Sequence, residues 1–569
     1  MNRRYSILFI ALFCFSLILN ICDIPIAWSQ STSTQADCAA IITKTASLKN
    51  VQISRSDLIA NDVQYPAYCL VQGKVNERKG LDGKTYAIGF ELRLPTAWNG
   101  RFLYQANGGN DGVVVPAEGD PNNLNSVGRV TALARGFAVL STDAGHNGAD
   151  PANASAGLLA GNMFGFDPQA RSDYGYASVA AMVPVARSVI KGYYGTDPSY
   201  SYMLGCSNGG RHGMVAAARY ADYFDGILAG DPGFDLPKAA VEHAWDIQSF
   251  QIASPDIRKS FSRDDMKLVA AKVVEKCDDL DGIKDGIVAD MRGCQGIFKL
   301  SDLQCKGEKD ATCLSADQVK ALERLMGGPR NSAGTQLYSD WPYDSGMGAA
   351  NWRFWKIESG VPPWDNYPLI AVMGAGSLEC IFTTPPVKAA GDPASLVGFL
   401  AHYDFDKDAP KIYARDGEFK ESAIEFMTPP DMADPKLAGL KAKGGKLIIY
   451  QGQSDGVFSA NAITGWYERL TSNYGGDATG FVRLFLVPGM NHCSGGPATD
   501  EFNGLTALMN WVEAGQAPDR IVASVNPSNP ELPADWSKAR TRPLCVWPKI
   551  AKYKGGDKEK ATSFQCELP

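Results

Sequence analysis

Residues 200–220 read YSYMLGCSNGGRHGMVAAARY and contain a Gly-x-Ser-x-Gly motif that runs from Gly205 to Gly209. In a nucleophile elbow, a sharp turn from strand to helix lifts the serine hydroxyl clear of the sheet, and small neighbours let the backbone approach closely. The apolar and aromatic residues before the motif predict a short buried strand, and the alanine-rich residues after it predict a helix. The stretch therefore predicts that Ser207 is a nucleophile in an α/β fold.

A serine nucleophile needs a base, and the base needs an acid that orients it. In α/β-hydrolases the acid and then the histidine follow the serine along the chain, in loops after late strands. Asp455 follows the strand-like residues 446–452, and His492 follows the strand-like residues 482–487. We predict that these two residues complete the triad. The alternatives are a simple turn at Asp455 and a packed or surface loop histidine at His492.

The other histidines fit the role of base less well. His243 and His402 lie away from strand ends, in a region of different composition. His212 follows the nucleophile within the predicted helix, where packing is the simpler role. His146 either lines the site or closes a turn.

A tetrahedral intermediate also needs hydrogen-bond donors for its oxyanion. The backbone N–H of Asn208 is one predicted donor. Residues 105–112, QANGGNDG, follow an early strand and offer the other, with Gly109 as first choice and Gly108 as second. The alternative for this segment is a flexible turn.

Strand-like and helix-like segments alternate from about residue 75 to residue 202, as a largely parallel sheet requires. From about residue 231 to residue 443 this rhythm is absent, and it resumes at residue 446. We predict an α/β-hydrolase catalytic domain formed by residues 30–230 and 446–569, with a large inserted lid domain at residues 231–445.

Arg3 and Arg4 stand near the start of the chain and precede an apolar run without charge from Tyr5 to Ile21, and small residues follow at Ala27 and Ser29. This pattern predicts a cleaved signal peptide at residues 1–29 and a secreted or periplasmic protein; an uncleaved membrane anchor is the alternative. Eleven of the 13 cysteines follow this segment, which suits an oxidising compartment. Neighbours along the chain, and the two cysteines that adjoin Ser207 and His492, suggest five disulfides and leave Cys380 unpaired. The proposed pairs are Cys38–Cys69, Cys206–Cys493, Cys277–Cys294, Cys305–Cys313 and Cys545–Cys566.

Residues 277–287, CDDLDGIKDGI, space carboxylates between glycine turns, as a hard cation such as calcium prefers. The predicted ligands are the side chains of Asp278, Asp281 and Asp285 and the carbonyls of Ile283 and Ile287. The loop lacks the final glutamate of an EF-hand. We predict a structural Ca²⁺ site, and the alternative is a solvated acidic turn held by a disulfide.

The elbow, the acid, the His-Cys pair, the acidic loop and the cysteine pairs together resemble the tannase and feruloyl esterase family, which also contains a hydrolase of mono(2-hydroxyethyl) terephthalate. The resemblance covers nearly the whole mature chain. It implies an α/β-hydrolase core, a lid with structural calcium, and hydrolysis of aromatic carboxylic esters. It also implies the triad and calcium ligands named above.

The expected partner is a small aromatic ester, with Phe458 and Phe382 as candidate contacts. The resemblance implies a lid arginine for a terephthalate carboxylate, but residues 376–382 contain none. Arg353 and Arg415 lie elsewhere in the lid. A net charge of -7 and a pI near 5.5 argue against nucleic-acid binding. Two other functions stay open: a calcium-stabilised binding protein on a hydrolase scaffold, and an amidase with the same triad.

Overall fold

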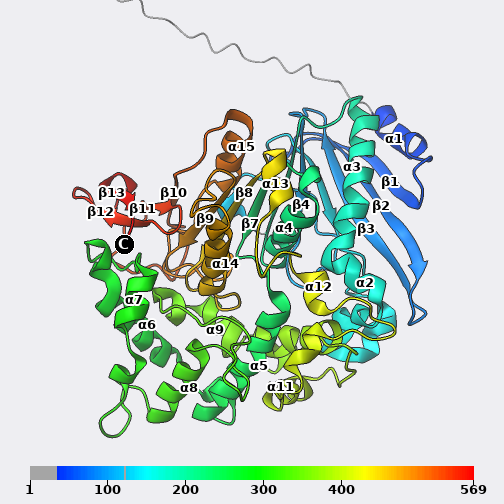
Figure 1. Cartoon of the computed structure of the whole chain (residues 1–569). Coiled ribbons are helices and arrows are strands. Elements are labelled where there is room, and N and C mark those ends of the chain that lie inside the picture. Colours follow the sequence, from blue (N-terminus) through cyan, green and yellow to red (C-terminus); the bar gives the residue numbers. More distant parts are fainter. Residues whose placement is uncertain (1–34, 121–122) are drawn as a thin grey trace, which may run out of the picture.

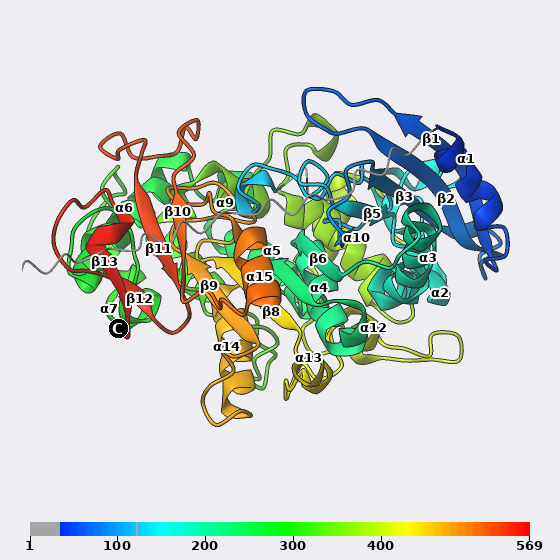
Figure 2. The ribbon, with the colours of Figure 1, turned by 90° about the horizontal axis from the view of Figure 1, so that it is seen from above.

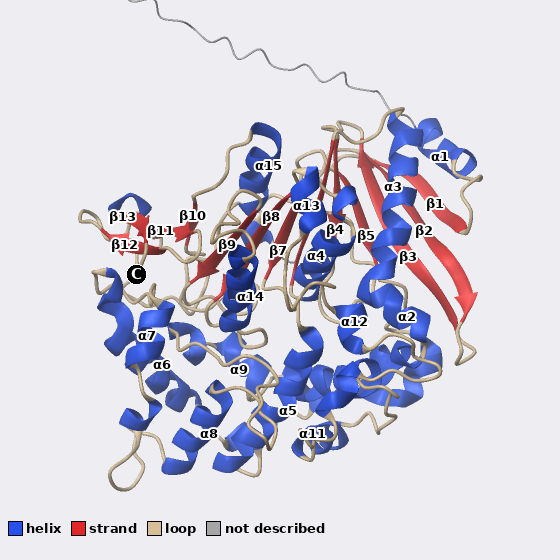
Figure 3. Ribbon diagram, in the orientation of Figure 1, coloured by secondary structure: helices blue, strands red, loops and turns tan. Residues whose placement is uncertain are grey.

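The computed structural model describes residues 35–120 and 123–569, so the predicted signal peptide lies outside the described residues. The centre of the molecule is a nine-stranded sheet in the order β1-β2-β3-β5-β4-β6-β7-β8-β9 (Figure 3). The six strands from β5 to β9 in that order run parallel, while β1, β2 and β3 pair antiparallel. The predicted α/β fold is confirmed. The strands are β1 Val51–Ile59, β2 Tyr68–Lys79, β3 Thr85–Pro95, β4 Arg101–Gln105, β5 Ala138–Thr142, β6 Tyr200–Cys206, β7 Gly226–Gly230, β8 Lys446–Gly452 and β9 Val482–Val487.

Helices cover both faces of the parallel strands because these strands are apolar on both sides. In β4, Phe102 and Tyr104 join the core beneath α3, α4 and α14, while Leu103 faces the core beneath α15. Figure 2 shows the sheet between these helices. The bounds are α3 Ser178–Tyr194, α4 Asn208–Arg219, α14 Ala460–Ser472 and α15 Gly504–Ala514. Helices packed on both faces of the sheet therefore hold the ends of these strands in place.

A large helical segment separates β7 from β8, although the two strands are hydrogen-bonded neighbours. Helices α5 to α11 gather below the sheet in the view of Figure 1. They share one extensive apolar core that also takes in Leu159, Phe164 and Tyr174 from the chain before β6. The helices of the segment are α5 Leu236–Ala253, α6 Arg263–Cys277, α7 Met291–Ile297, α8 Ala316–Met326, α9 Ala350–Lys356, α10 Ala375–Ser377, α11 Pro393–Ala401, α12 Ala423–Met427 and α13 Ala438–Lys443.

The alternation of strands and helices begins later than we predicted. Between β1 and β5 the described residues form no α-helix, and α2 (Pro168–Ser172) is the first after β5. Antiparallel neighbours such as β2 and β3 are joined by a short turn, whereas parallel neighbours need a long crossover. Only the later parallel strands therefore show the predicted alternation.

The C-terminal residues form two small antiparallel sheets beside α6 and α7 (Figures 1 and 2). One pairs β10 (Arg520–Ser524) with β11 (Thr541–Cys545), and the other pairs β12 (Ile550–Tyr553) with β13 (Phe564–Glu567). All five predicted disulfides are present, and Cys380 is a buried free thiol. Within residues 35–120 and 123–569, every helix is too short or too polar to span a bilayer.

Candidate active site

Ser207 occupies a tight turn between β6 and α4. Its backbone has φ 65° and ψ -126°, an arrangement that non-glycine residues rarely adopt. A side-chain carbon on Gly205 or Gly209 would lie 2.4 or 2.3 Å from the carbonyl oxygen of Ala106, so both positions require glycine. The Ser207 N–H donates to the Gly230 carbonyl at 2.9 Å. The local geometry is that of a nucleophile elbow.

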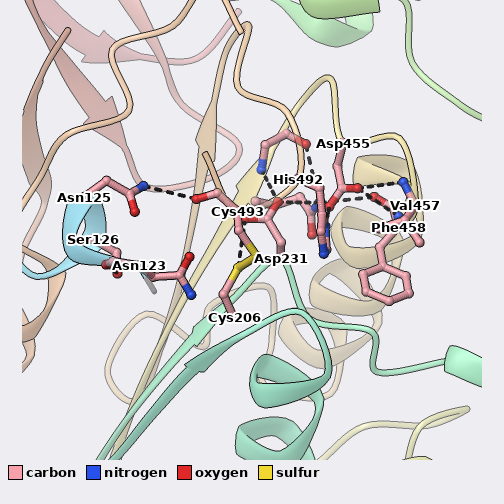
Figure 4. The surroundings of a disulfide bond; sticks show 12 residues. Asn123, Asn125, Ser126, Cys206, Asp231, Asp455, Val457, Phe458, His492 and Cys493 are labelled. Carbon is pink, nitrogen blue, oxygen red and sulfur yellow. Dashed lines mark hydrogen bonds and ion pairs between the residues drawn. A yellow bond between two sulfur atoms is a disulfide. The ribbon is translucent and has the colours of Figure 1, made fainter. Parts of the chain in front are cut away.

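Asp455 and His492 form a buried pair at the carboxyl ends of β8 and β9 (Figure 4). His492 Nδ1 lies 2.8 Å from Asp455 Oδ2. The N–H groups of Val457 and Phe458 donate to Asp455 Oδ1 at 2.7 and 3.0 Å, which holds the carboxylate in place. His492 Nε2 is buried and receives no hydrogen bond from any described residue, Ser207 included. This nitrogen is therefore free to accept a proton.

A disulfide joins the residue before the nucleophile to the residue after the histidine. The Cα atoms of Cys206 and Cys493 are 6.0 Å apart, across 287 positions of sequence. The Asn125 side chain donates to the Cys493 carbonyl at 3.1 Å (Figure 4). Ser207 and His492 are thus tethered to each other through one covalent link.

Two aromatic rings pack edge-on against the histidine. The ring centroids of Trp355 and Phe458 lie 4.8 and 5.4 Å from that of His492. Phe458 therefore packs against His492, and Trp355 brings the segment between β7 and β8 into direct contact with the same ring. Phe382 is 1 % exposed and belongs to the lid core. The sequence offered several lid tryptophans and no signal that favoured Trp355.

The predicted oxyanion loop lies against the elbow. A side-chain carbon on Gly108 would be 3.7 Å from the Cys206 carbonyl oxygen and 3.8 Å from Ser207 Cβ, whereas the same position on Gly109 is open. Gly109 has φ 63°, a conformation that favours glycine. Gly108, the second choice of the sequence analysis, therefore stands beside the nucleophile, whereas Gly109 faces open space.

A second histidine and aspartate connect this loop to the elbow helix. Asp111 Oδ2 accepts from the Asn208 side chain at 2.7 Å and lies 2.9 Å from His212 Nε2. Burial, and then the neighbouring Arg211, lower the pKa of His212. A neutral His212 donates this hydrogen bond to Asp111 through Nε2–H. The network fixes Asn208, whose backbone N–H is the first predicted oxyanion donor.

The remaining histidines do not reach the triad. His146 stacks on Phe164 at 3.7 Å, and burial lowers the pKa of its ring to about 4. His243 is buried in the lid, and burial lowers its pKa to about 3. His402 is exposed at the end of α11. Of the five histidines, His492 alone lies beside a buried carboxylate at the end of a sheet strand.

The acidic loop after α6 brings together three carboxylates that are each less than 9 % exposed, Asp278, Asp281 and Asp285. Asp278 accepts the N–H groups of residues 285, 286 and 287. Arg542 forms an ion pair with Asp285. Desolvation and then the charge of Asp285 raise the pKa of Asp281 to about 7. The excess of buried negative charge suits a bound cation. Among the described residues, however, the ligand atoms of these three carboxylates do not all lie within 4.8 Å of one another.

Arg353 and Arg415, the two arginines considered for a substrate carboxylate, both form ion pairs. Arg353 Nε donates to Glu358 at 2.7 Å, and Arg353 Nη2 donates to the Phe261 carbonyl at 2.8 Å. Arg415 pairs with Glu425. Each guanidinium group thus already has a carboxylate partner in this arrangement.

The chain is similar in sequence to known esterases. The family model described as tannase and feruloyl esterase matches residues 69–567. The chain is 41% identical over 546 residues to a mono(2-hydroxyethyl) terephthalate hydrolase of Piscinibacter sakaiensis, covering 90% of this chain and 86% of that protein. It is 30% identical over 482 residues to a probable feruloyl esterase of Arthroderma benhamiae, covering 84% and 81%.

Solved structures share the fold at lower identity. Feruloyl esterase B from Aspergillus oryzae superposes with a TM-score of 0.72 at 22% identity, covering 94% of this chain and all of that one. Tannin acyl hydrolase from Aspergillus niger gives 0.68 at 18% identity, covering 94% and 95%. The match across residues 69–567 and the 41% identity show that the chain is a carboxylic ester hydrolase of the tannase and feruloyl esterase family.

Proposed function

We propose that this protein is an exported serine esterase that hydrolyses aromatic carboxylic esters through an acyl-enzyme on Ser207. The observation that carries the proposal is the 2.8 Å contact between His492 and the buried Asp455, tethered to the elbow by the Cys206–Cys493 disulfide. A serine on a strained turn with an oriented histidine is the arrangement that acyl transfer requires.

In the acylation step, Ser207 Oγ attacks the ester carbonyl and His492 Nε2 takes its proton. Asp455 holds the Nδ1–H and stabilises the imidazolium. The backbone N–H groups of Asn208 and Gly109, or of Gly108 in its place, stabilise the oxyanion. His492 then returns the proton to the leaving alkoxide, and the alcohol departs.

In deacylation, a water molecule gives a proton to His492 and attacks the acyl carbonyl. Collapse of the second tetrahedral intermediate breaks the bond to Ser207 Oγ. The serine recovers the proton from His492, and the carboxylic acid leaves. Each turnover thus consumes one ester and one water.

The aromatic preference rests on the rings that border the histidine. Trp355 and Phe458 present apolar surface against the ring of His492, where an aryl acyl group would pack edge-on or offset. Feruloyl, galloyl and terephthaloyl esters all carry such a group. The engaged state of Arg353 and Arg415 favours acids without a second free carboxylate.

Calcium belongs to the proposal as a structural ion. Asp278, Asp281 and Asp285, with the carbonyls of Ile283 and Ile287, would hold it. Bound there, it would neutralise buried carboxylates and stiffen the turn after α6. The loop contributes no side chain to the triad, so the proposed chemistry proceeds without the ion.

Export is the remaining part of the proposal. Residues 1–29 have the pattern of a signal peptide, and five disulfides suit a secreted or periplasmic protein.

One substrate panel tests the function. It contains methyl ferulate, methyl gallate, a terephthalate half-ester and a p-nitroanilide, each assayed with the wild type and with Ser207→Ala. We expect ester turnover that disappears in Ser207→Ala. Turnover of the anilide in preference to the esters would favour the amidase. Absence of turnover on the whole panel would favour the binding protein.

A further inference from the structure

A second buried carboxyl, that of Asp231, lies beside the His492–Asp455 pair. Asp231 directly follows β7, is fully buried, and has φ 36°. The strand β7 stands between β6, which ends before Ser207, and β8, which ends before Asp455. Because parallel strands end at one edge of a sheet, Asp231 follows the middle strand of these three. Figure 4 shows Asp231 between Cys206 and Asp455.

The side chain of Gln451 donates hydrogen bonds to both Asp231 and Asp455. Its Oδ1 accepts the Gly452 N–H at 2.8 Å and the Gln451 Nε2 at 3.0 Å. The same Gln451 nitrogen lies 3.0 Å from Asp455 Oδ2. Asp231 Oδ2 lies 3.6 Å from Cys206 Sγ. One buried network therefore includes both carboxyls and reaches the disulfide.

The carboxyls of Asp231 and Asp455 and the ring of His492 each offer one atom, and these three atoms all lie within 4.8 Å of one another. Neither carboxyl pairs with a lysine or arginine among the described residues. Two buried carboxyls this close do not both ionise, so one of them carries a proton. Burial and then the charge of Asp455 raise the pKa of Asp231 well above its usual range, so Asp231 holds that proton.

We propose that Asp231 is a positioning residue for His492: in its neutral form it supports Asp455, and when Asp455 is removed it ionises and takes over the orientation of the histidine. This inference rests on the proposed function. Loss of Asp455 leaves the Asp231 carboxyl alone beside the ring of His492. The negative charge that opposed the ionisation of Asp231 is then gone. The ring itself stays in place because Trp355, Phe458 and the disulfide at Cys493 all hold it.

A double-mutant cycle tests the proposal on the full-length enzyme with methyl ferulate. Asp231→Asn keeps the shape and the hydrogen bonds of the neutral acid, so we expect a loss of about threefold in kcat with KM unchanged. We expect Asp455→Ala to lose about 30-fold. Loss of a triad acid with no substitute costs about 10⁴-fold, and we expect that loss only in the combined variant. The two single effects multiply to about 100-fold, so the cycle reports strong coupling.

Two outcomes would overturn the inference. One is a combined variant within about threefold of the product of its single effects; the other is an Asp455→Ala variant that already loses about 10⁴-fold. Melting curves establish that each variant is folded, and Asp455→Asn replaces Asp455→Ala if the latter unfolds at the assay temperature. The variant Ser207→Ala distinguishes a failure of the proposed function from a failure of the role of Asp231. Residual ester turnover in Ser207→Ala refutes the proposed function, whereas an inactive Ser207→Ala with an additive cycle refutes the role of Asp231 alone.

Discussion

Removal of the Cys206–Cys493 disulfide offers the sharpest test of how the site is held together. The perturbation is the double substitution Cys206→Ala and Cys493→Ala. The bond closes a loop of 287 positions, and the chain-entropy relation gives a stability contribution of about 5 to 6 kcal/mol for a loop of that length. The folded state also changes, because the loop that carries His492 loses its covalent anchor. That loop keeps the hydrogen bond from Asn125 to the Cys493 carbonyl.

The matched control is Cys545→Ala with Cys566→Ala. That disulfide closes a loop of 21 positions between β11 and β13, away from the triad, and the same relation gives about 3 kcal/mol. Urea midpoints measure stability for both variants, and kcat is measured in the absence of urea at a temperature where both are folded. A displacement of about 1 Å in a reacting group costs about 10²-fold. We therefore expect kcat to fall about 100-fold in the first variant and to remain at the wild-type value in the control.

The result that refutes this reasoning is a Cys206/Cys493 variant whose kcat stays within about threefold of the wild type while its urea midpoint falls. The disulfide would then act on the unfolded chain alone, and packing around His492 would suffice to place the base.

Four further expectations concern other parts of the molecule. Chelation of calcium is expected to lower the melting temperature, and a chelated sample with unchanged melting and metal content contradicts the site. In the metal-free protein the folded pKa of Asp281, about 7, exceeds its ordinary 3.8; the folded form binds the proton more tightly, so stability falls as pH rises from about 4 to about 7. Melting curves across that range check the sign, and added calcium is expected to abolish the fall. Trp355→Ala is expected to lower kcat/KM for aryl esters about 10-fold and for a small alkyl ester much less, as aromatic packing contributes about 0.5–1.5 kcal/mol; equal losses on both substrates count against an acyl contact. Asp111→Ala is expected to lower kcat about 10-fold or more with little change in KM, because the oxyanion donors lose their support; a change confined to KM contradicts that role.

The sharp turn at Ser207 and the contact between Asp455 and His492 were predictable because each has a local signature. Gly205 and Gly209 are required by the approach of Ala106, and this requirement is visible as a short motif. Asp455 and His492 each follow a strongly apolar strand. The disulfides were predictable because most partners are close in sequence or adjoin a triad residue.

Asp231, Asp111 and Trp355 were not predictable in the same way. Each acts through a neighbour that is remote in sequence, and no spacing rule joins Asp231 to Asp455 or Trp355 to His492. The antiparallel start of the sheet was missed because strand-like residues do not by themselves show the direction in which β2 and β3 pair. Tertiary contact, and not local pattern, assigns these residues their roles.

The position of Asp231 also bears on how a substrate reaches the site. The inserted segment begins at this residue, so the root of the lid is itself bonded to Gly452 and Gln451 beside the triad. A rigid swing of the whole lid about that root would disrupt the support of the acid at each turnover. Substrate entry is therefore expected to use local movement of segments farther from the root, and not a hinge at this end.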